Sequence, residues 1–127
     1  MPFLHVWFST KNRRWLLQDE IAVKAKDLFM AIAAEKHIEL IETETAIDHV
    51  HMLLLAANDT DLSWRMKLLK GRSAYEIFRF FPWLKTSEGL GSFWQASYKA
   101  RIVPENHLET VRRYIRTQDE RLEKFER

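Results

Sequence analysis

The chain has 127 residues, of which 46% are hydrophobic, with three glycines, three prolines and no cysteine. This length suits one domain with a real core, and we expect a single domain over residues 1–127. Without cysteine there are no disulfides, thiolate zinc sites or cysteine nucleophiles, so a metal site must use histidine, carboxylate or amide ligands. No apolar run approaches the roughly 20 residues of a membrane span, and no signal peptide precedes the first strand, which favours the cytoplasm.

The net charge is only +2, but the charges are segregated along the chain. Cations dominate residues 61–80, whereas acidic residues dominate residues 35–48. A basic segment next to many aromatic residues suits a polyanion whose bases can stack. The alternative is that most of these aromatic residues form the core and that the cations lie on a solvated helix face.

The first half of the chain predicts a strand, a helix and a strand pair. The segment FLHVWFST, residues 3–10, is rich in β-forming residues. From Trp15 to about His37, apolar residues recur at spacings of three and four, which predicts an amphipathic helix. The alternating segment HIELIETETA, residues 37–46, then leads into the apolar run AIDHVHMLLLA, residues 46–56, and the two predict paired strands.

The second half predicts a helix, a strand and a final helix. Residues 58–61 offer several N-caps for a helix through roughly Phe80, with Gly71 interrupting it and Pro82 closing it. Residues 93–103 predict a strand or two short ones, and Pro104 suits the first turn of a helix that extends to about Phe125. The resulting order of strands and helices is that of an α+β fold. It is compatible with a ferredoxin-like antiparallel sheet covered by helices.

Two histidines stand in the most apolar segment of the chain. Because side chains alternate along a strand, His49 and His51 project from the same face, about 6.5–7 Å apart at Cα. Both faces of this strand are otherwise apolar, which predicts a central strand and largely buried imidazoles. The two rings either bind one metal ion or hydrogen-bond to protein groups only. Asp48 is expected to point to the opposite face and to supply no ligand.

The last helix carries a second polar residue on an apolar stripe. Leu108, Val111, Ile115, Leu122 and Phe125 form this stripe, and Gln118 occupies the position that would complete it. An amide oxygen is an acceptable ligand for a divalent cation. Tyr114 lies one turn before Gln118 and therefore next to it on the helix surface.

These residues together suggest a reaction on a phosphodiester. A divalent ion held by two imidazoles and an amide keeps its charge uncompensated and would attract a phosphate. Tyr114 is a poor nucleophile alone, but it becomes usable when the metal and cations such as Arg112, Arg113 and Arg116 stabilise its phenolate. The products would be a 5′-phosphotyrosine and a free 3′ hydroxyl, so that rejoining needs no ATP.

The His-hydrophobic-His motif, followed some sixty residues later by YIRTQ, resembles the single-tyrosine HUH transposases. This family includes the TnpA-type enzymes of single-strand insertion sequences and relatives associated with repeated extragenic palindromes. Five segments resemble the family and occur in its order, over nearly the whole chain: STKNRRWLL, DHVHMLLL, KLLKGRSAYEIFRFFP, FWQASYKARIV and VRRYIRTQ.

The resemblance implies a role for each matching residue. Tyr114 would be the nucleophile on the C-terminal helix, and His49, His51 and Gln118 would hold Mg²⁺ or Mn²⁺. It also implies a homodimer and a single-stranded DNA substrate with a hairpin, cleaved and rejoined at the ends of an element. The residues expected to contact DNA are basic: Lys11, Arg13, Arg14, Lys67, Lys70, Arg72, Arg112 and Arg113.

Two other functions are compatible with the sequence. The first is a non-catalytic module that binds single-stranded nucleic acid and tolerates Tyr114→Phe. The second is a metal-dependent nuclease that uses activated water, in which Tyr114 is incidental. Tyr98 is the rival nucleophile, but it is expected in a strand without a ligand-type residue one helical turn away.

Overall fold

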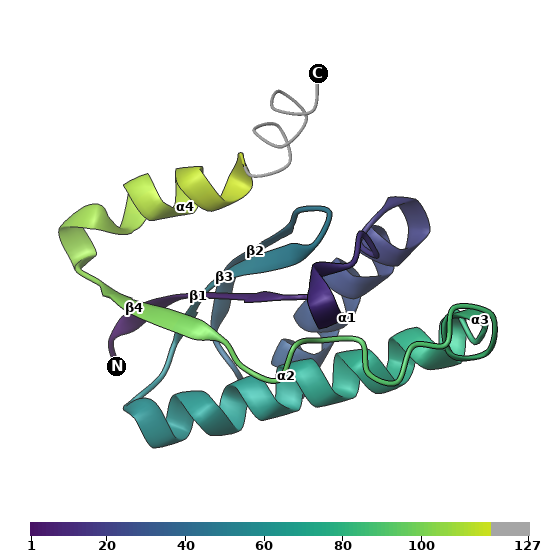
Figure 1. The fold of residues 1–127 in the computed structure, drawn as a ribbon. Helices are drawn as coiled ribbons and strands as arrows, with labels where there is room; N and C mark the ends of the chain where they lie inside the picture. Colours follow the sequence, from purple (N-terminus) through teal and green to yellow (C-terminus); the bar gives the residue numbers. More distant parts are fainter. Residues whose placement is uncertain (118–127) are drawn as a thin grey trace.

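The computed structural model describes residues 1–117, which fold into a four-stranded sheet with helices on both faces (Figure 1). The elements follow one another as β1 (Phe3–Ser9), the 3₁₀ turn η1 (Lys11–Arg13), α1 (Asp19–Glu35), β2 (Leu40–Thr45), β3 (His49–Leu55), α2 (Asp59–Phe80), α3 (Trp83–Thr86), β4 (Lys99–Val103), the 3₁₀ turn η2 (Glu105–His107) and α4 (Leu108–Arg116). None of these helices combines the length and apolar character that crossing a membrane would take.

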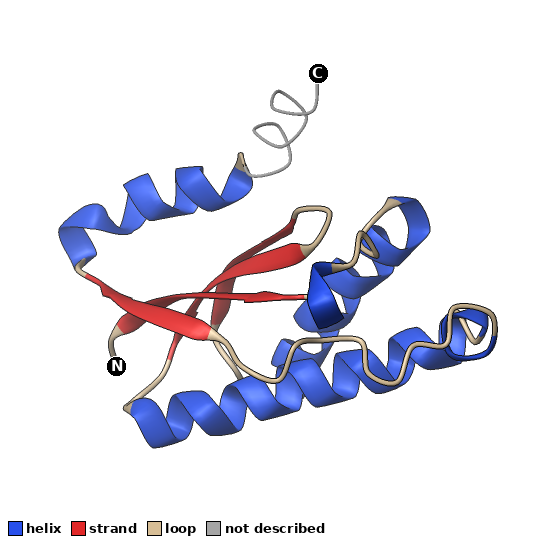
Figure 2. Ribbon diagram, in the orientation of Figure 1, coloured by secondary structure: helices blue, strands red, loops and turns tan. Residues whose placement is uncertain are grey.

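The sheet has the strand order β2-β3-β1-β4, and every neighbouring pair is antiparallel (Figure 2). This order, with a helix after β1 and another after β3, is the ferredoxin-like arrangement. The α+β fold predicted from the sequence is therefore confirmed. β3 is central, as its apolar sequence predicted, and β2 and β4 are the two edges.

One face of the sheet packs against α1 and α2 and holds the main core. Val6, Met52 and Phe29 are fully buried in this cluster. The Phe29 ring lies 6.0 Å from that of Phe8 and 5.6 Å from that of Trp94, between ring centroids. This core continues into the segment between α3 and β4, where Trp94 Nε1–H donates to Ser73 Oγ at 2.9 Å.

The opposite face of the sheet is covered by α4, which Figure 1 shows on the other side of the sheet from α2. The buried residues here are Leu53 of β3, Val103 of β4 and Ile115 of α4, with Leu108 and Val111 packed against them. The apolar stripe predicted for the last helix is thus confirmed over the described residues. Its continuation at Gln118, Leu122 and Phe125 lies outside them.

Three predicted elements differ from the observed ones. Gly71 does not interrupt α2, which is continuous from Asp59 to Phe80, because one glycine in a well-packed helix is tolerated. The strand predicted over residues 93–103 is confined to Lys99–Val103, since Trp94 is buried in the core and makes only an isolated bridge with Thr10. Pro104 precedes a 3₁₀ turn, and α4 itself begins at Leu108.

The first helix also begins later than predicted, at Asp19 instead of Trp15. Between the end of β1 and the first residue of α1, Asn12, Arg13 and Asp19 have positive φ, of 57°, 54° and 48°. Such angles are uncommon for residues other than glycine. The apolar residues Leu16 and Leu17 are buried without being helical, so a helical spacing alone could not separate this segment from α1.

Candidate active site

The strand register gathers five polar or aromatic side chains on the face beneath α4. Trp7 of β1 lies directly opposite His51 of β3, and Ser9 lies opposite His49. Directly paired residues of antiparallel strands project to the same side, and His5 shares this face because it lies two residues before Trp7 on β1. The His49 and His51 rings are 5.0 Å apart between centroids, which confirms that they lie side by side.

His49 is held by a carboxylate. Its Nδ1–H donates to Asp48 Oδ1 at 2.8 Å, and Arg13 Nε–H donates to Asp48 Oδ2 at 3.1 Å. The prediction that Asp48 points away from the histidines is wrong, because Asp48 lies in the turn before β3, where strand alternation does not apply. Burial opposes ionisation of Asp48, but the hydrogen bonds from His49 and Arg13 outweigh it, so the pKa lies below its usual value.

His51 is held by another histidine. Its Nδ1 lies 2.8 Å from Nε2 of His5, and both side chains are buried. Burial lowers the pKa of His51 to about 3, with smaller contributions from the charges of His49 and His5. The pKa of His5 is also lowered, first by burial and then by the charge of Arg101. Both rings are therefore neutral at physiological pH, which is the form that ligates metals.

Tyr114 of α4 lies against this histidine group within the same chain. Its ring centroid is 5.8 Å from that of His51 and 6.0 Å from that of His5, in both cases edge to face. Tyr114 as a whole residue keeps 38% exposure. The structure thus brings together the predicted nucleophile and the predicted histidine pair, which are more than sixty residues apart in sequence.

The rival Tyr98 is placed differently. It lies just before β4 and not within a strand, and its hydroxyl is 3.0 Å from Ser63 Oγ of α2. It borders a cavity of 250 Å³ that His49, His51 and Lys99 also line. Tyr98 therefore faces the same space as the histidines, but it is anchored to α2, whereas Tyr114 packs directly on the imidazoles.

The donor set of the site fits a divalent metal ion. His49 and His51 each engage Nδ1 in a contact within the protein, so an ion would have to be held through Nε2 of each ring. Over residues 1–117, no group of three His, Asp or Glu side chains could hold a metal, so a third protein ligand must be of another kind or lie elsewhere. Gln118, the predicted third ligand, lies outside the described residues.

The two edges of this face carry opposite charge. β2 presents Glu42 and Glu44, and β4 presents Lys99 and Arg101. The acidic edge is neutralised, because Arg116 and Arg112 approach Glu42 at 3.1 and 3.5 Å and Lys26 pairs with Glu44. On the basic edge, the guanidinium of Arg101 lies over the Trp7 ring, 5.7 Å from its centroid. The basic edge is therefore the side of the histidine group that suits an anion.

The predicted DNA contacts differ in how their charges are compensated in the structure. Four of these cations pair with a carboxylate from a distant part of the chain: Arg13 with Asp48, Arg14 with Glu88, Arg72 with Glu35 and Arg112 with Glu42. Within the described residues, Lys11, Lys67 and Arg113 form no ion pair. These three cations are the more available for phosphates, since a paired cation must first give up its partner.

Lys70 has a structural position that its sequence context does not reveal. Its Nζ donates to the backbone oxygens of Gln95 and Ser97 at 2.6 and 3.0 Å and thereby ties the segment before β4 to α2. Burial lowers the pKa of Lys70 to about 8. Its neighbour Lys67 is exposed, with Nζ 5.9 Å from the centroid of the Trp64 ring.

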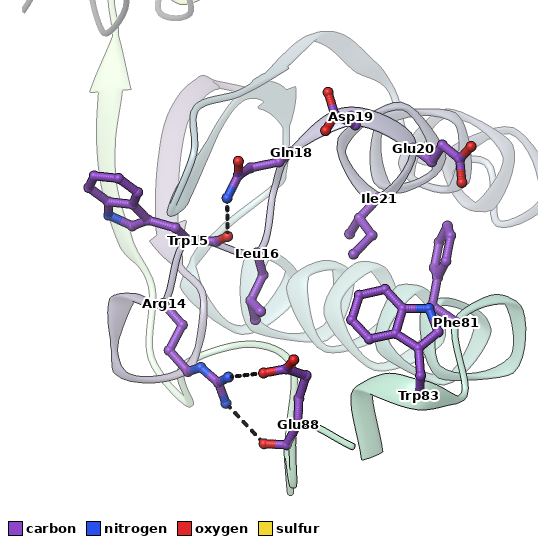
Figure 3. Close-up of a pocket in the computed structure, with 10 residues that line it drawn as sticks. All are labelled: Arg14, Trp15, Leu16, Gln18, Asp19, Glu20, Ile21, Phe81, Trp83 and Glu88. Carbon is purple, nitrogen blue, oxygen red and sulfur yellow. Dashed lines mark hydrogen bonds and ion pairs between the residues drawn. The ribbon is translucent and has the colours of Figure 1, made fainter. Parts of the chain in front are cut away.

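A larger cavity, of 620 Å³, lies between the segment before α1 and α3 (Figure 3). Arg14 Nη2–H donates to Glu88 Oε2 at 2.9 Å on one side of it, and Gln18 Nε2–H donates to the backbone oxygen of Trp15 at 2.7 Å. The indole of Trp15 is exposed. The histidines do not line this cavity, and Arg14, another of the predicted DNA contacts, is compensated there by Glu88.

The sequence interpretation missed His5, Asp48, Lys99 and Arg101 as parts of the site. The alternation in KARIV, residues 99–103, places the two cations on one face of a strand, which is a usable signal. The position of His5 beside His51 depends on the register between β1 and β3, for which the sequence gives no direct sign. Asp48 is adjacent to His49, but the turn that directs its carboxylate back is not encoded by a pattern.

Some of the aromatic residues lie in the core and others are exposed. Phe93 and Trp94 are buried in the core, as the second of the two alternatives drawn from the sequence predicted. Four others remain exposed on or near α2 and are available for stacking: Trp64, Tyr75, Phe80 and Trp83.

The fold and this group of residues define a class of protein: a ferredoxin-like domain with a histidine pair on its central strand and a tyrosine on a helix that covers it. The chain matches the family described as "Transposase IS200 like" over residues 3–118. It is 35% identical over 117 residues to the ISDra2 transposase TnpA of Deinococcus radiodurans, covering 92% of this chain and 84% of that protein. The chain belongs to the IS200-like transposase family and is a transposase.

Further relatives agree with this assignment. The transposase of the insertion sequence element IS200 of Salmonella typhimurium is 28% identical, over 90% of this chain and 74% of its own length. A solved transposase structure from Deinococcus radiodurans R1 superposes with a TM-score of 0.72 at 35% identity, covering 92% of this chain and 90% of its own. A REP-associated tyrosine transposase bound to a REP hairpin has the same fold, with a TM-score of 0.64 at 16% identity, over 91% and 65% of the two chains.

Proposed function

We propose that this transposase cleaves and rejoins single-stranded DNA at hairpin-flanked element ends through a 5′-phosphotyrosine on Tyr114. The observation that carries the proposal is the packing of the Tyr114 ring on His51 and His5 within one chain. Tyr114 thus packs on His51, whose ring lies 5.0 Å from that of His49 between centroids, and a tyrosine beside such a pair of metal-ligand candidates is suited to a metal-assisted attack on a phosphodiester.

In the proposed reaction, the phenolic oxygen of Tyr114 attacks the phosphorus, and the bond from phosphorus to the 3′ oxygen breaks. The tyrosine proton is lost, and the departing 3′ oxygen gains a proton. Rejoining is the reverse, in which a 3′ hydroxyl attacks the phosphotyrosine and Tyr114 leaves. Mg²⁺ or Mn²⁺, held by Nε2 of His49 and His51 and by Gln118, would polarise the phosphate and stabilise the leaving oxygen.

The proposed DNA path begins at the basic edge of the histidine group. Lys99 and Arg101 lie on the strand next to β1, and Lys99 lines the same cavity as His49 and His51. The REP-associated relative is bound to a REP hairpin, which supports a hairpin as the structured part of the substrate. For the hairpin we retain the basic residues predicted from the sequence, with Lys11, Lys67 and Arg113 carrying most of the phosphate contacts.

The proposed assembly is a homodimer, as in the family that the sequence resembles. β4 is an edge strand with an exposed Ile102, so its backbone is open to pairing. In the described structure α4 lies on the histidines of its own chain, and exchange of this helix between subunits would assemble the same site across the dimer.

The test is a covalent adduct between protein and DNA. Purified protein is incubated with Mn²⁺ and labelled single-stranded hairpin DNA, taken from the ends of the element that encodes it, and analysed by denaturing gel and mass spectrometry. An adduct on Tyr114 that is lost in Tyr114→Phe and His49→Ala is the expected result. Tyr75→Phe is the matched control, because Tyr75 is an exposed tyrosine on α2, distant in sequence from the site.

The other outcomes identify the competing functions. Cleavage that persists in Tyr114→Phe without any adduct contradicts the phosphotyrosine and indicates a nuclease that uses activated water. Binding without cleavage, equal in the wild type and in Tyr114→Phe, indicates a binding module. An adduct on Tyr98 would reassign the nucleophile to the second tyrosine that faces the histidine cavity.

A further inference from the structure

His5 is a third buried histidine in the site, and the function proposed above gives it no role. It lies on β1, and its Nε2 is 2.8 Å from Nδ1 of His51. We propose that His5 is a positioning residue, which accepts a hydrogen bond from His51 and thereby fixes the tautomer and ring orientation in which His51 binds metal. This inference rests on the metal-dependent function proposed above.

The short contact between the two rings allows only two proton arrangements when both are neutral. In the first, His51 Nδ1–H donates to His5 Nε2, and Nε2 of His51 carries a lone pair. In the second, His5 Nε2–H donates to His51 Nδ1, and the remaining proton of His51 occupies Nε2. Only the first arrangement leaves His51 able to bind a metal through Nε2, so a metal at this atom requires His5 as the acceptor.

His5 itself is a poor candidate for a metal ligand. Its Nε2 is already occupied by His51, and His5, His49 and His51 do not form a group of three that could hold a metal. His5 therefore acts on the ion through His51 instead of touching it.

The surroundings of His5 hold its ring in place for this role. The ring is packed between Trp7, at 5.0 Å between centroids, and Tyr114, at 6.0 Å, and its plane is inclined by only 30° to that of His51, with the two centroids 5.1 Å apart. The antiparallel pairing of β1 with β3 fixes the backbone positions of both histidines. A rigid acceptor of this kind limits rotation of the His51 imidazole.

The two histidines thus have different supporting partners. Asp48 accepts the hydrogen bond from His49 Nδ1 as an anion, whereas His5 accepts from His51 as a neutral ring. With both Nδ1 atoms occupied, both Nε2 atoms are left for a shared ion. A neutral acceptor at His51 also adds no negative charge, which leaves the positive charge of the ion for a phosphate.

The test measures metal binding without DNA or turnover. Mn²⁺ is titrated into the full-length protein, and free Mn²⁺ is followed by electron paramagnetic resonance. His5→Phe, which keeps a ring and removes the acceptor, should weaken binding by about 10- to 100-fold. His5→Gln, whose amide oxygen can accept at the same distance along the side chain, should restore binding to within about threefold of the wild type. His107→Phe is the matched control, since His107 is exposed in the turn before α4.

Two further measurements separate positioning from a general structural effect. Long-range ¹H–¹⁵N NMR of the metal-free protein should place the His51 proton on Nδ1 in the wild type, and on Nε2 in a substantial fraction of His5→Phe. In a His51→Ala background, His5→Phe should change Mn²⁺ affinity by less than about twofold, because its effect acts through His51.

The inference is overturned if His5→Phe binds Mn²⁺ as tightly as the wild type, or if the wild type carries the His51 proton on Nε2. If circular dichroism shows that His5→Phe does not fold, the inference is tested by the Mn²⁺ affinity of His5→Gln and by the tautomer of His51 in the wild type. A wild-type protein that binds no Mn²⁺ would instead contradict the proposed metal dependence, and the tautomer would then test the role of His5 alone.

Discussion

The two faces of the sheet differ in how much apolar contact covers them. The face under α1 and α2 is the wall of a large core in which Phe29, Met52 and Leu69 are fully buried. The face under α4 has a small apolar cluster around Leu53 and Ile115, and the rest of it is occupied by the histidine group. The proposed chemistry therefore lies on the thinly covered face, where a helix can move without disrupting the core.

Two kinds of contact, apolar packing and ion pairs, hold α4 on the sheet. Ile115 provides its one fully buried contact within the described residues, while Arg112 and Arg116 pair with Glu42 at the edge of the sheet. Partly exposed ion pairs contribute little to stability. We therefore expect α4 to open locally at a lower free energy than global unfolding, whereas α1 and α2 should open only with the whole domain.

The largest effect is expected from Phe29→Ala on the core face. The Phe29 ring is fully buried and contacts the rings of Phe8 and Trp94. Its removal should lower the free energy of unfolding by about 3–5 kcal/mol, measured by urea denaturation. Val23→Ala, an exposed position on the same helix, should change it by less than about 0.5 kcal/mol. A loss below about 2 kcal/mol for Phe29→Ala would contradict the assignment of the main core to this face.

A smaller global effect is expected from Ile115→Ala, although Ile115 is equally buried. Truncation of a buried isoleucine in a core costs about 2–5 kcal/mol. Here the loss should stay below about 2 kcal/mol, because α4 can detach while the sheet persists. Hydrogen exchange should accelerate in α4 and remain unchanged in β1 and β3.

The control for Ile115→Ala is Ile102→Ala, which removes the same atoms at an exposed position of β4 and should leave exchange in α4 unaltered. If Ile115→Ala accelerated exchange in the sheet as much as in α4, the helix would be part of the cooperative core. The difference between the two faces would then be one of composition only.

The same contrast explains which features the sequence could predict. The strand of His49 and His51 and the apolar stripe of α4 follow from periodicity, because each element buries a face at its own repeat. The approach of Tyr114 to the histidines followed from combining these two patterns with the family resemblance. Local sequence patterns, together with the resemblance, thus predicted the fold and the proximity of Tyr114 to the histidines.

The supporting contacts could not be predicted in this way. The acceptor for His51 is His5, forty-six residues earlier, and only the register of β1 on β3 brings them together. Asp48 turns toward His49 because it precedes the strand, and Lys70 is occupied by two carbonyl groups of a segment whose path has no sequence repeat. Contacts that depend on register or on irregular backbone leave no periodic signal.

A gain in stability confined to the core face is expected from Gly71→Ala. Gly71 lies within the continuous helix α2, and a Cβ at this position would meet nothing within 4 Å. Alanine should therefore stabilise the domain by about 0.5–1 kcal/mol in urea denaturation. Exchange in α4 should not change, since its opening does not involve α2. A destabilised variant would indicate that α2 needs the flexibility of glycine at this point.

The smallest effect is expected from Glu42→Gln, which removes the charge that Arg112 and Arg116 share. The loss should be about 0.2–1 kcal/mol and should appear as faster exchange of α4 amides, with global unfolding nearly unchanged. The difference between variant and wild type should shrink at high salt, because salt screens partly exposed charges. Glu76→Gln is the matched control, since Glu76 pairs with Arg79 inside α2 and leaves α4 untouched. If Glu42→Gln instead lowered global stability and left α4 exchange unchanged, the ion pairs would belong to the sheet edge, and Ile115 alone would hold the tyrosine helix over the histidines.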